Sequence, residues 1–292
     1  MLRKVALLGE VSRKEDVRNI AAKTLIEVSS AMVDIEYDRD LYISVLEYYE
    51  GNFIDEKKKL SKEDIKLLEE TIREYRRMGF DLPENKQKRL KILLKKASLY
   101  GEQFRKNIND YSDYILCTEE EVSGLSKRVT STLPKDTATG KYIVTLQYPH
   151  IGPFMSFAQN RKKREELANK NLKKGGKKNL KLINDLVNIR TEISSILGYA
   201  HHGDFRTENR MAKTAEKVEV FQNNLLKKLI VPAEKDVHSL LAHARTLGIE
   251  KLEHYDIAYV ANDLKKKLYD IDQEIVREYF PLEHVMSEMF SV

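Results

Sequence analysis

Apolar residues recur at helical spacing over most of this chain, and that pattern restricts the fold more than any other feature. From Val17 to Ile35, for example, they return every three or four residues and mark one face of a helix. The chain has 292 residues with only 12 glycines and 6 prolines, and 33% of its residues are charged. This combination is typical of globular proteins built from long charged helices. We therefore expect a mainly α fold, a bundle of long helices.

Start signals divide the first part of the pattern into separate helices. Ser12 and Glu15 have the spacing of a capping box, in which the side chain of each residue accepts the backbone amide of the other. Ser61 is expected to start another helix, and Pro83 fits the first position of a helix of about 28 residues. At 1.5 Å per residue, that last helix would be a rod of about 40 Å.

The second half contains a polar joint between two helices. Gly198 follows the last apolar pair of one helix, where a left-handed C-terminal cap is expected, and the hydroxyl of Thr214 fits the start of the next. The helix after Thr214 is very long and contains Pro232, which predicts a kink because proline lacks an amide donor. Further helix starts are expected at Asp256 and at Asp270 or Asp272.

One segment between these helical parts alternates with the period of a strand. Tyr142, Val144 and Leu146 face one way and the residues between them face the other, and the run DYILC upstream is a candidate partner strand. Pro149 and Pro153 are expected to end the second strand. Thr118 and Glu121 predict a capping box before a brief helix. We therefore predict one small antiparallel pair in the middle of the chain.

These patterns divide the chain into three parts. We expect an N-terminal helical region at residues 1–111, a small mixed α/β segment at 112–158 and a second helical region at 159–292. The length is consistent with about two domains or one large one.

The seven histidines do not form a recognisable metal motif. His238 and His243 are five residues apart, so on a helix their side chains diverge, and the adjacent His201 and His202 also point apart. We expect the adjacent pair to cap or pack the joint, with contact to a partner surface as the alternative. His150 lies in the turn after the predicted strand and is expected to bond to nearby backbone.

The single cysteine, Cys117, excludes an intrachain disulfide and favours a reducing compartment. It ends an apolar run with no basic neighbour, so we interpret it as a small buried hydrophobe and not as a reactive thiol. The sequence contains no nucleophile elbow, P-loop or dinucleotide fingerprint. We therefore expect no catalytic, cofactor-binding or metal-ligating residue in this chain.

Three basic runs remain, at Arg161–Arg164, Lys173–Lys178 and Lys86–Lys96. Basic residues at helical spacing are usually the solvated face of an amphipathic helix, which is our interpretation. The alternative is a basic groove for RNA, but few aromatic residues are interleaved to stack on bases. The net charge of +5 is modest. No run is long or apolar enough for a signal peptide or a membrane span, so we expect a cytoplasmic protein.

Three strings of the sequence resemble a known enzyme family. They are KYIVTLQYPHIGPF, ILGYAHHGDFRTENRMAKTAEKVEVF and EIVREYFPLEHV, and the similarity runs in consistent order from about Val17 to Phe290. Within them the specific matches are YPH, LGY with the polar joint, MAKT and EYFP. In these strings the chain resembles the amino-terminal part of the thimet oligopeptidase and neurolysin family of zinc metallopeptidases.

The resemblance implies a function in which this chain supplies only part of the machinery. In the family, long helices form one wall of a channel for short peptides, and zinc is bound further along the chain by an HExxH motif. This sequence contains no HExxH. The resemblance therefore implies a metalloendopeptidase whose zinc is bound elsewhere, with this chain inactive alone. Three explanations for the missing zinc motif stay open. The chain could be truncated, it could belong to a split enzyme with a second zinc-bearing chain, or it could be a degenerate family member kept for binding. The competing function is a non-catalytic helical module that binds RNA or another protein.

The sequence departs from the family's pattern in two places. Tyr255 stands where members commonly have tryptophan, which leaves the local packing open, and the match begins later than members usually start. We also expect an uncovered apolar face on the last helix, where a zinc-bearing half would dock. It comprises Leu282, Val285, Met286, Met289 and Phe290.

Overall fold

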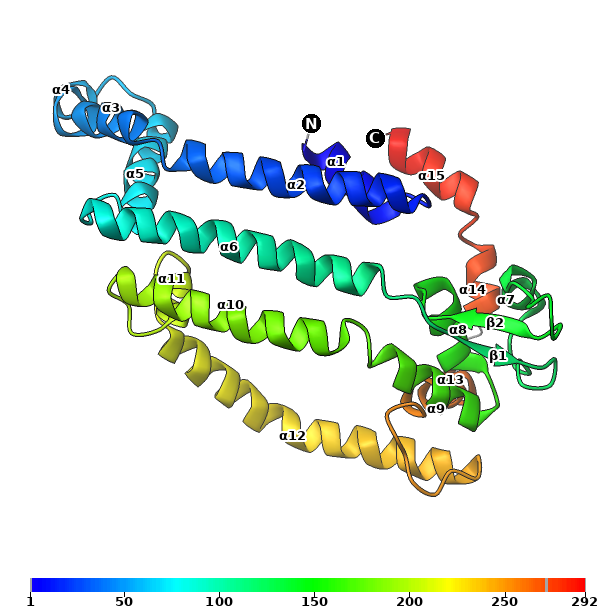
Figure 1. The fold of residues 1–292 in the computed structure, drawn as a ribbon. Helices are drawn as coiled ribbons and strands as arrows, with labels where there is room; N and C mark the ends of the chain where they lie inside the picture. The colour runs from blue at the N-terminus through cyan, green and yellow to red at the C-terminus, as the bar shows by residue number, and fades with distance from the viewer. Residues whose placement is uncertain (1, 271–272, 292) are drawn as a thin grey trace. The chain divides into compact units, whose positions relative to one another are not determined.

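The computed structural model describes residues 2–270 and 273–291, and it is mainly helical, as predicted (Figure 1). The chain forms two compact units, each assembled from two separate segments. Unit 1 comprises residues 1–111 and 175–221, and unit 2 comprises residues 112–174 and 222–292. The two units are therefore interleaved along the sequence. The three-part division expected from the sequence stays a prediction.

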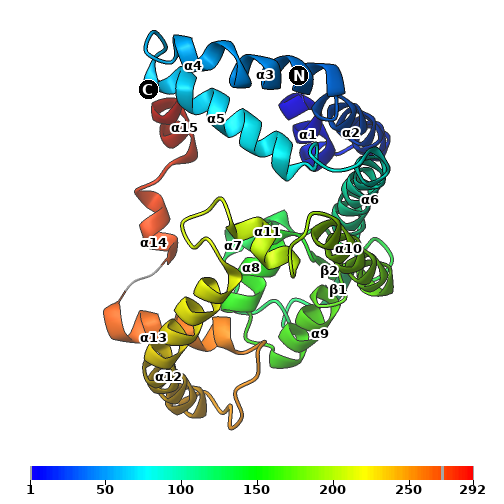
Figure 2. The ribbon, with the colours of Figure 1, turned by 90° about the vertical axis from the view of Figure 1, so that its left-hand side faces the viewer.

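Unit 1 is built on helices that lie side by side. Helix α2 packs against α1 and α6, and α6 packs against α10 (Figures 1 and 2). Leucines of α6 and isoleucines of α10 form the core between those two helices. The helices are α1 (Leu2–Val11), α2 (Glu15–Glu36), α6 (Glu84–Asn109) and α10 (Gly176–Ile196), and the buried core residues are Leu90, Leu93, Ile189 and Ile193.

One end of unit 1 is closed by an aromatic cluster of Tyr42, Tyr75 and Phe80. Tyr42 lies on α3 and Tyr75 on α5, and the ring of Phe80 is 4.7 Å from that of Tyr42 and 5.1 Å from that of Tyr75. The remaining helices of the unit are α3 (Arg39–Glu50), α4 (Asn52–Glu56), α5 (Lys62–Arg77) and α11 (His202–Thr207).

The predicted helix starts of unit 1 have different outcomes. Ser61 caps α5 in a complete capping box with Asp64, as a helix start there requires. The capping box expected at Ser12 is wrong, because Lys14 occupies the N-cap of α2 and the Ser12 hydroxyl accepts only the amide of Lys14. Pro83 is the N-cap of α6 and not its first residue.

Unit 2 contains the predicted strand pair. Strand β1 (Tyr114–Cys117) pairs antiparallel with β2 (Tyr142–Thr145), and Tyr114 lies opposite Thr145. The outer edge of β1 is covered by lysines of helix α9 (Arg161–Asn171). The ammonium of Lys170 donates to the carbonyl of Tyr114 at 2.7 Å, and that of Lys163 donates to the carbonyl of Leu116 at 2.9 Å.

Two short elements of unit 2 differ from the sequence-based expectation. Thr118 and Glu121 form both bonds of a capping box, but they close a turn, and the brief helix α7 (Lys127–Thr132) starts later at Ser126. Helix α8 (Tyr148–Phe157) was not predicted, because its prolines, Pro149 and Pro153, indicated the end of a strand. Pro149 is in the first turn of α8 and Pro153 is inside it.

Four helices complete the described part of the chain. They are α12 (Ala215–Thr246), α13 (Ile257–Tyr269), α14 (Gln273–Glu278) and α15 (Leu282–Ser291). The hydroxyl of Thr214 accepts the amide of Lys217, which confirms the predicted start of α12. The helix continues through Pro232, and the kink there stays a prediction. Asp270 is the left-handed C-cap of α13, while Asp272 lies outside the described residues. No helix in the described part of the chain is long and apolar enough to cross a membrane.

Candidate functional site

The adjacent histidines of the joint have the roles expected from the sequence. His201 is the N-cap of α11, and its Nδ1 accepts the amide of Asp204 at 3.3 Å. The ring of His202 lies 5.7 Å from that of Phe205. Burial lowers the pKa of His202, and the nearby positive charges of two arginines lower it further. Capping and packing are therefore confirmed for this pair.

His150, His238 and His243 differ in their surroundings. His150 Nδ1 is 2.8 Å from the hydroxyl of Thr145 and accepts the amide of the same residue, so its local backbone bond is confirmed. Burial lowers the pKa of His150. His243 is buried and bonds Asp263 at 2.7 Å, whereas His238 is exposed. Within residues 2–270 and 273–291, no group of three histidine, cysteine or acidic side chains could hold a metal ion.

Cys117 is completely buried at the end of β1. Burial raises the pKa of its thiol to about 12, since the nearby Lys163 offsets only part of the cost of a buried thiolate. The thiol is therefore protonated near neutral pH, and the interpretation of Cys117 as a small buried hydrophobe is confirmed.

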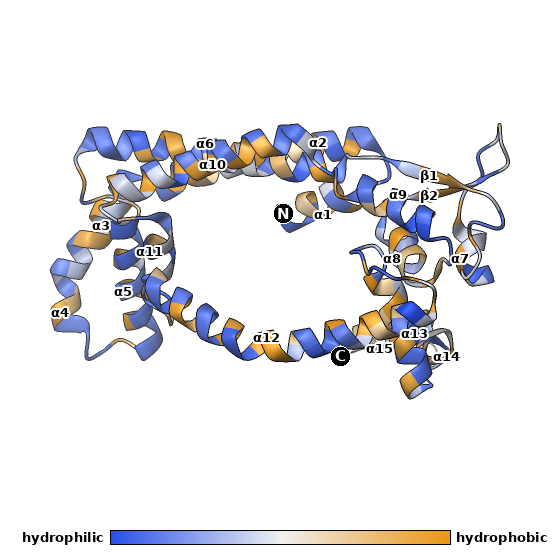
Figure 3. Ribbon diagram, turned by 90° about the horizontal axis from the view of Figure 1, so that it is seen from below, coloured by the Kyte–Doolittle hydropathy of each residue, from blue (hydrophilic) through white to orange (hydrophobic). Residues whose placement is uncertain are grey.

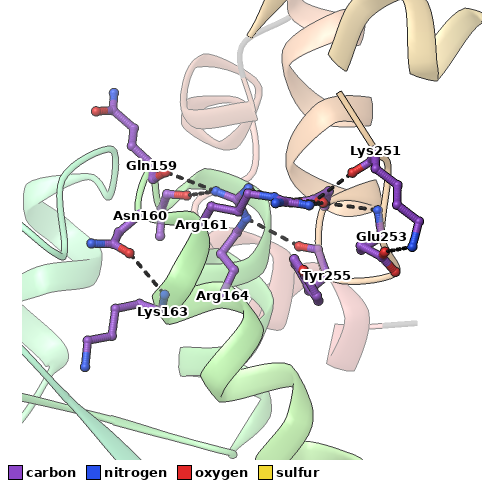
Figure 4. Close-up of polar contacts among 10 residues, drawn as sticks. Gln159, Asn160, Arg161, Lys163, Arg164, Lys251, Glu253 and Tyr255 are labelled. Atoms are coloured by element: carbon purple, nitrogen blue, oxygen red, sulfur yellow. Dashed lines mark hydrogen bonds and ion pairs between the residues drawn. The ribbon is translucent and has the colours of Figure 1, made fainter. Parts of the chain in front are cut away.

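A buried polar network of unit 2 joins α9 to the residues before α13. We call Arg161, Arg164 and Asp256 the arginine–aspartate cluster, and Figure 4 labels its two arginines. Arg161 donates to both carboxylate oxygens of Asp256, at 2.7 to 3.1 Å, and Arg164 Nη2 donates to Oδ1 at 3.0 Å. Asp256 also accepts the amide of Glu253 at 3.1 Å. Each oxygen of this buried carboxylate thus has at least two donors.

The arginines have further partners that fix their positions. Arg164 is fully buried and donates to the carbonyls of Ala158, Gln159 and Tyr255 at 2.7 to 3.3 Å. Arg161 also donates to the carbonyl of Lys251 at 3.0 Å (Figure 4). These bonds engage all three nitrogens of the Arg164 guanidinium and two of those of Arg161, so the cluster holds two chain segments together.

The electrostatics of the cluster favour the ionised carboxylate. Burial alone would raise the pKa of Asp256, but hydrogen bonds from Arg161, the Glu253 amide and Arg164 together lower it below its ordinary value. Asp256 occupies the N-cap position of α13, yet its side chain caps no helix amide. The helix start expected at Asp256 is confirmed, but the Asp256 side chain does not cap the helix because its carboxylate is bound to the arginines.

The cluster also corrects the interpretation of the basic run at Arg161–Arg164. A solvated face was expected there, but Arg164 is 0% exposed and Arg161 is bound to a buried carboxylate. On α6, Lys91 and Lys95 both contact Asp34 of α2. These basic residues are therefore partly neutralised by acidic partners, which weakens the case for a basic groove. The lysines at Lys177 and Lys178 are exposed, as expected.

Tyr255 stands where members of the family that this chain resembles commonly have tryptophan, and it is buried in this chain. Its side chain is 9% exposed, and the guanidinium of Arg161 lies 5.2 Å from its ring centre. Sequence reasoning missed the cluster because its partners are 92 and 95 residues apart along the chain, and no local spacing connects them. The only available signal was an aspartate directly after an aromatic residue, which also suits a helix cap.

Comparisons with known proteins agree with the resemblance. The model of peptidase family M3 matches residues 154–292, which include the arginine–aspartate cluster. A thimet-like oligopeptidase of Dictyostelium discoideum is 24% identical over 98% of this chain and 44% of its own length. Saccharolysin of Saccharomyces cerevisiae is 24% identical over 100% of this chain and 42% of its own length, and oligopeptidase A of Escherichia coli is 25% identical over 99% and 44%.

The chain thus spans less than half of the length of these relatives. Similarity nevertheless extends over nearly every residue of the chain itself, including the segment before the matched family model. The chain is therefore a homologue of peptidase family M3, the family of thimet oligopeptidase and oligopeptidase A, along its whole length.

Proposed function

We propose that this chain is the channel-wall part of a zinc metallo-oligopeptidase that hydrolyses short peptides. The observation that carries the proposal is the relation to the M3 relatives, which covers nearly all of this chain but only 42–44% of three of them. In the complete enzyme, zinc would supply an activated water. The residues described here do not offer a fitting ligand group, so the zinc would be held by another segment or chain.

Helix α12 supports the requirement for another polypeptide. Every residue from Glu219 to Ser239 is exposed, although hydrophobic residues recur all along the helix (Figure 3). Long helices gain most of their stability from packing an apolar face, and each large side chain contributes about 1.5–3 kcal/mol when it is buried. The large apolar residues, each 43–66% exposed, are Val220, Phe221, Leu225, Leu226, Leu229, Ile230, Val231 and Val237.

Helix α15 supports the same proposal. Its apolar residues Leu282, Val285, Met286, Met289 and Phe290 are 40–75% exposed, as expected for an uncovered face. A zinc-bearing half that docks on α12 and α15 would bury these side chains. The proposal retains the cytoplasmic location expected from the sequence.

The test compares this chain alone with a mixture. The second component is the part of Escherichia coli oligopeptidase A outside the aligned region, expressed separately, and both are assayed on a fluorogenic short peptide. A mixture of that part with the aligned part of the same oligopeptidase shows first that the two halves can assemble. We expect no hydrolysis and no stoichiometric zinc for this chain alone, and hydrolysis in the mixture. Stoichiometric zinc that only a chelator removes from this chain would overturn the proposal.

The alternative is a helical module that binds RNA through its exposed lysines, such as Lys177 and Lys178. Binding through phosphates releases counterions, so the affinity for RNA would fall steeply as the salt concentration rises. A flat or absent response to salt eliminates this alternative.

A further inference from the structure

A cavity of about 420 Å³ lies in unit 1 where the joint meets α5. The joint is the segment from Gly198 to Thr214, between α10 and α12. The volume is within the range of small-molecule sites. The cavity is lined by Arg73, Arg76 and Arg77 of α5 and by Tyr199, Glu208, Asn209 and Lys213 of the joint.

The charges around the cavity favour an anion. Four of the seven lining residues are cationic, and only Glu208 is acidic. The carboxylate of Glu208 is already engaged by Arg77 and by the hydroxyl of Tyr199, which donates to it at 2.6 Å. Burial and this hydrogen bond raise the pKa of Tyr199 to about 12, so the hydroxyl remains a donor near neutral pH. The negative charge of Glu208 is therefore largely offset by Arg77.

Arg77 is held rigidly before any ligand arrives. Its side chain is 8% exposed, Nη2 donates to the carbonyl of Phe205 at 2.7 Å, and its guanidinium lies 4.6 Å from the Phe205 ring. Its Nε is buried and has no hydrogen-bond partner among the described residues, while the carboxylate of Glu74 is 3.6 Å away. This ion pair with Glu74 further restricts the position of the guanidinium.

The other cations are available to a ligand at low cost. Arg73 pairs with Glu70, and Arg76 lies 3.7 Å from Asp81, with both arginine side chains about half exposed. Exposed ion pairs contribute about 0–1 kcal/mol, so an anion in the cavity could replace these partners. Lys213 is exposed, and its ammonium makes no ion pair within the part of the chain that the structure describes.

The helix dipole accounts for only part of this arrangement. Basic residues are favoured in the last turn of a helix, which explains Arg76 and Arg77 at the end of α5. Lys213 does not belong to that helix. It comes from the joint and has a left-handed backbone with φ of 66°, so the fold of the joint places this positive charge on the cavity.

We propose that this cavity binds a small oxyanion, either the C-terminal carboxylate of a short peptide or a phosphate group. The positive charges of Arg73, Arg76 and Lys213 and the fixed guanidinium of Arg77 would recognise the negative oxygens. The site needs no zinc and no second polypeptide, so it goes beyond the proposed peptidase function and is tested without it.

The experiment is isothermal titration calorimetry on the whole chain at low ionic strength. The probes are inorganic phosphate, N-acetyl-alanyl-alanine with a free carboxylate, and the C-terminal amide of the same dipeptide. Binding of the free acid but not of the amide assigns the site to a peptide carboxylate. Binding of phosphate alone assigns it to a phosphate group. No binding of either anion, or equal binding of the acid and the amide, overturns the proposal.

Variants show whether any binding belongs to this cavity. Lys213→Asn removes the charge and keeps a residue that tolerates a left-handed backbone, and Arg73→Gln removes a second cation. Each should weaken binding about tenfold, the size expected for one lost charge-assisted hydrogen bond. The control is Lys177→Gln, an exposed lysine of unit 1 outside the cavity lining, which should leave binding unchanged. Equal weakening by all three variants would show only unspecific attraction and refute the site.

Discussion

Replacing Asp256 by asparagine tests the importance of the arginine–aspartate cluster. Asparagine keeps the shape of the side chain but leaves the buried guanidinium of Arg164 without a counter-charge. Removing one partner of a buried ion pair costs about 3–5 kcal/mol. Because the total stability of a domain is only about 5–15 kcal/mol, this loss should be visible as a large fall in the free energy of unfolding of unit 2.

A matched variant separates the buried from the exposed arginine. The side chain of Arg161 is 42% exposed, so Arg161→Gln should cost only about 1 kcal/mol after solvent screening. Hydrogen exchange of peptides from α9 reports on unit 2, and peptides from α6 serve as the internal control in unit 1. Urea unfolding, monitored by hydrogen exchange of these peptides, gives the stability loss of each variant in each unit. The measurement therefore does not assume that both units unfold together.

The pH dependence provides a second check on the same residue. The pKa of Asp256 is lowered in the folded protein, so its charge contributes stability that is present above the unfolded value of about 3.9. This contribution is lost as the pH falls toward the lower folded value. The difference in stability between the original chain and Asp256→Asn should therefore be largest near pH 7 and shrink below about pH 4. A difference below about 1 kcal/mol at pH 7, or one that stays constant with pH, would refute the reasoning.

Two further pairs of substitutions test local geometry. Gly124 has φ of 94°, and an added Cβ would overlap the carbonyl oxygen of Phe157, whereas Gly140 has φ of 69° and open space around it. Gly140→Ala should cost about 1–2 kcal/mol of stability because of the left-handed backbone. Gly124→Ala should lower the melting temperature clearly more than Gly140→Ala, because it adds the overlap with Phe157. Equal falls in melting temperature would contradict this reasoning. Ser61→Ala should lower the free energy of unfolding by about 0.5–2 kcal/mol because it removes the cap of α5. Ser12→Ala should change it by less than about 0.5 kcal/mol in urea unfolding, because Ser12 is not the N-cap of α2. A larger effect of Ser12→Ala would contradict this assignment.

Features decided by neighbouring residues could be predicted from the sequence. The cap at Ser61 depends on a residue three positions away, and the two strands follow from the local alternation of their residues, although their register does not. Helix α8 could not be predicted in the same way, because Pro153 disfavours a helix locally. The buried side chain of Phe154, on a helix that packs against α13, shows that tertiary contacts outweigh this local preference.

The role of the arginine run was beyond local analysis for a different reason. A charge run has the same composition whether it faces water or a buried carboxylate. Only the approach of Asp256, more than 90 residues later, decides that Arg164 is inside. The absence of a self-contained active site, which the sequence predicts, is tested only by the zinc and hydrolysis measurements above.

The interleaving of the two units restricts the order in which the chain can fold during synthesis. The core between α6 and α10 cannot form until the segment at 112–174 has left the ribosome, although that segment belongs to the other unit. Closing such a loop has an entropic cost, and the early leucines of α6 stay uncovered meanwhile. Neither unit can be obtained by a single cut, because each requires two separate stretches of the chain. A rearranged chain in which residues 175–221 directly follow residue 111 would make unit 1 contiguous, and unit 1 should then fold earlier on the ribosome than in the natural order.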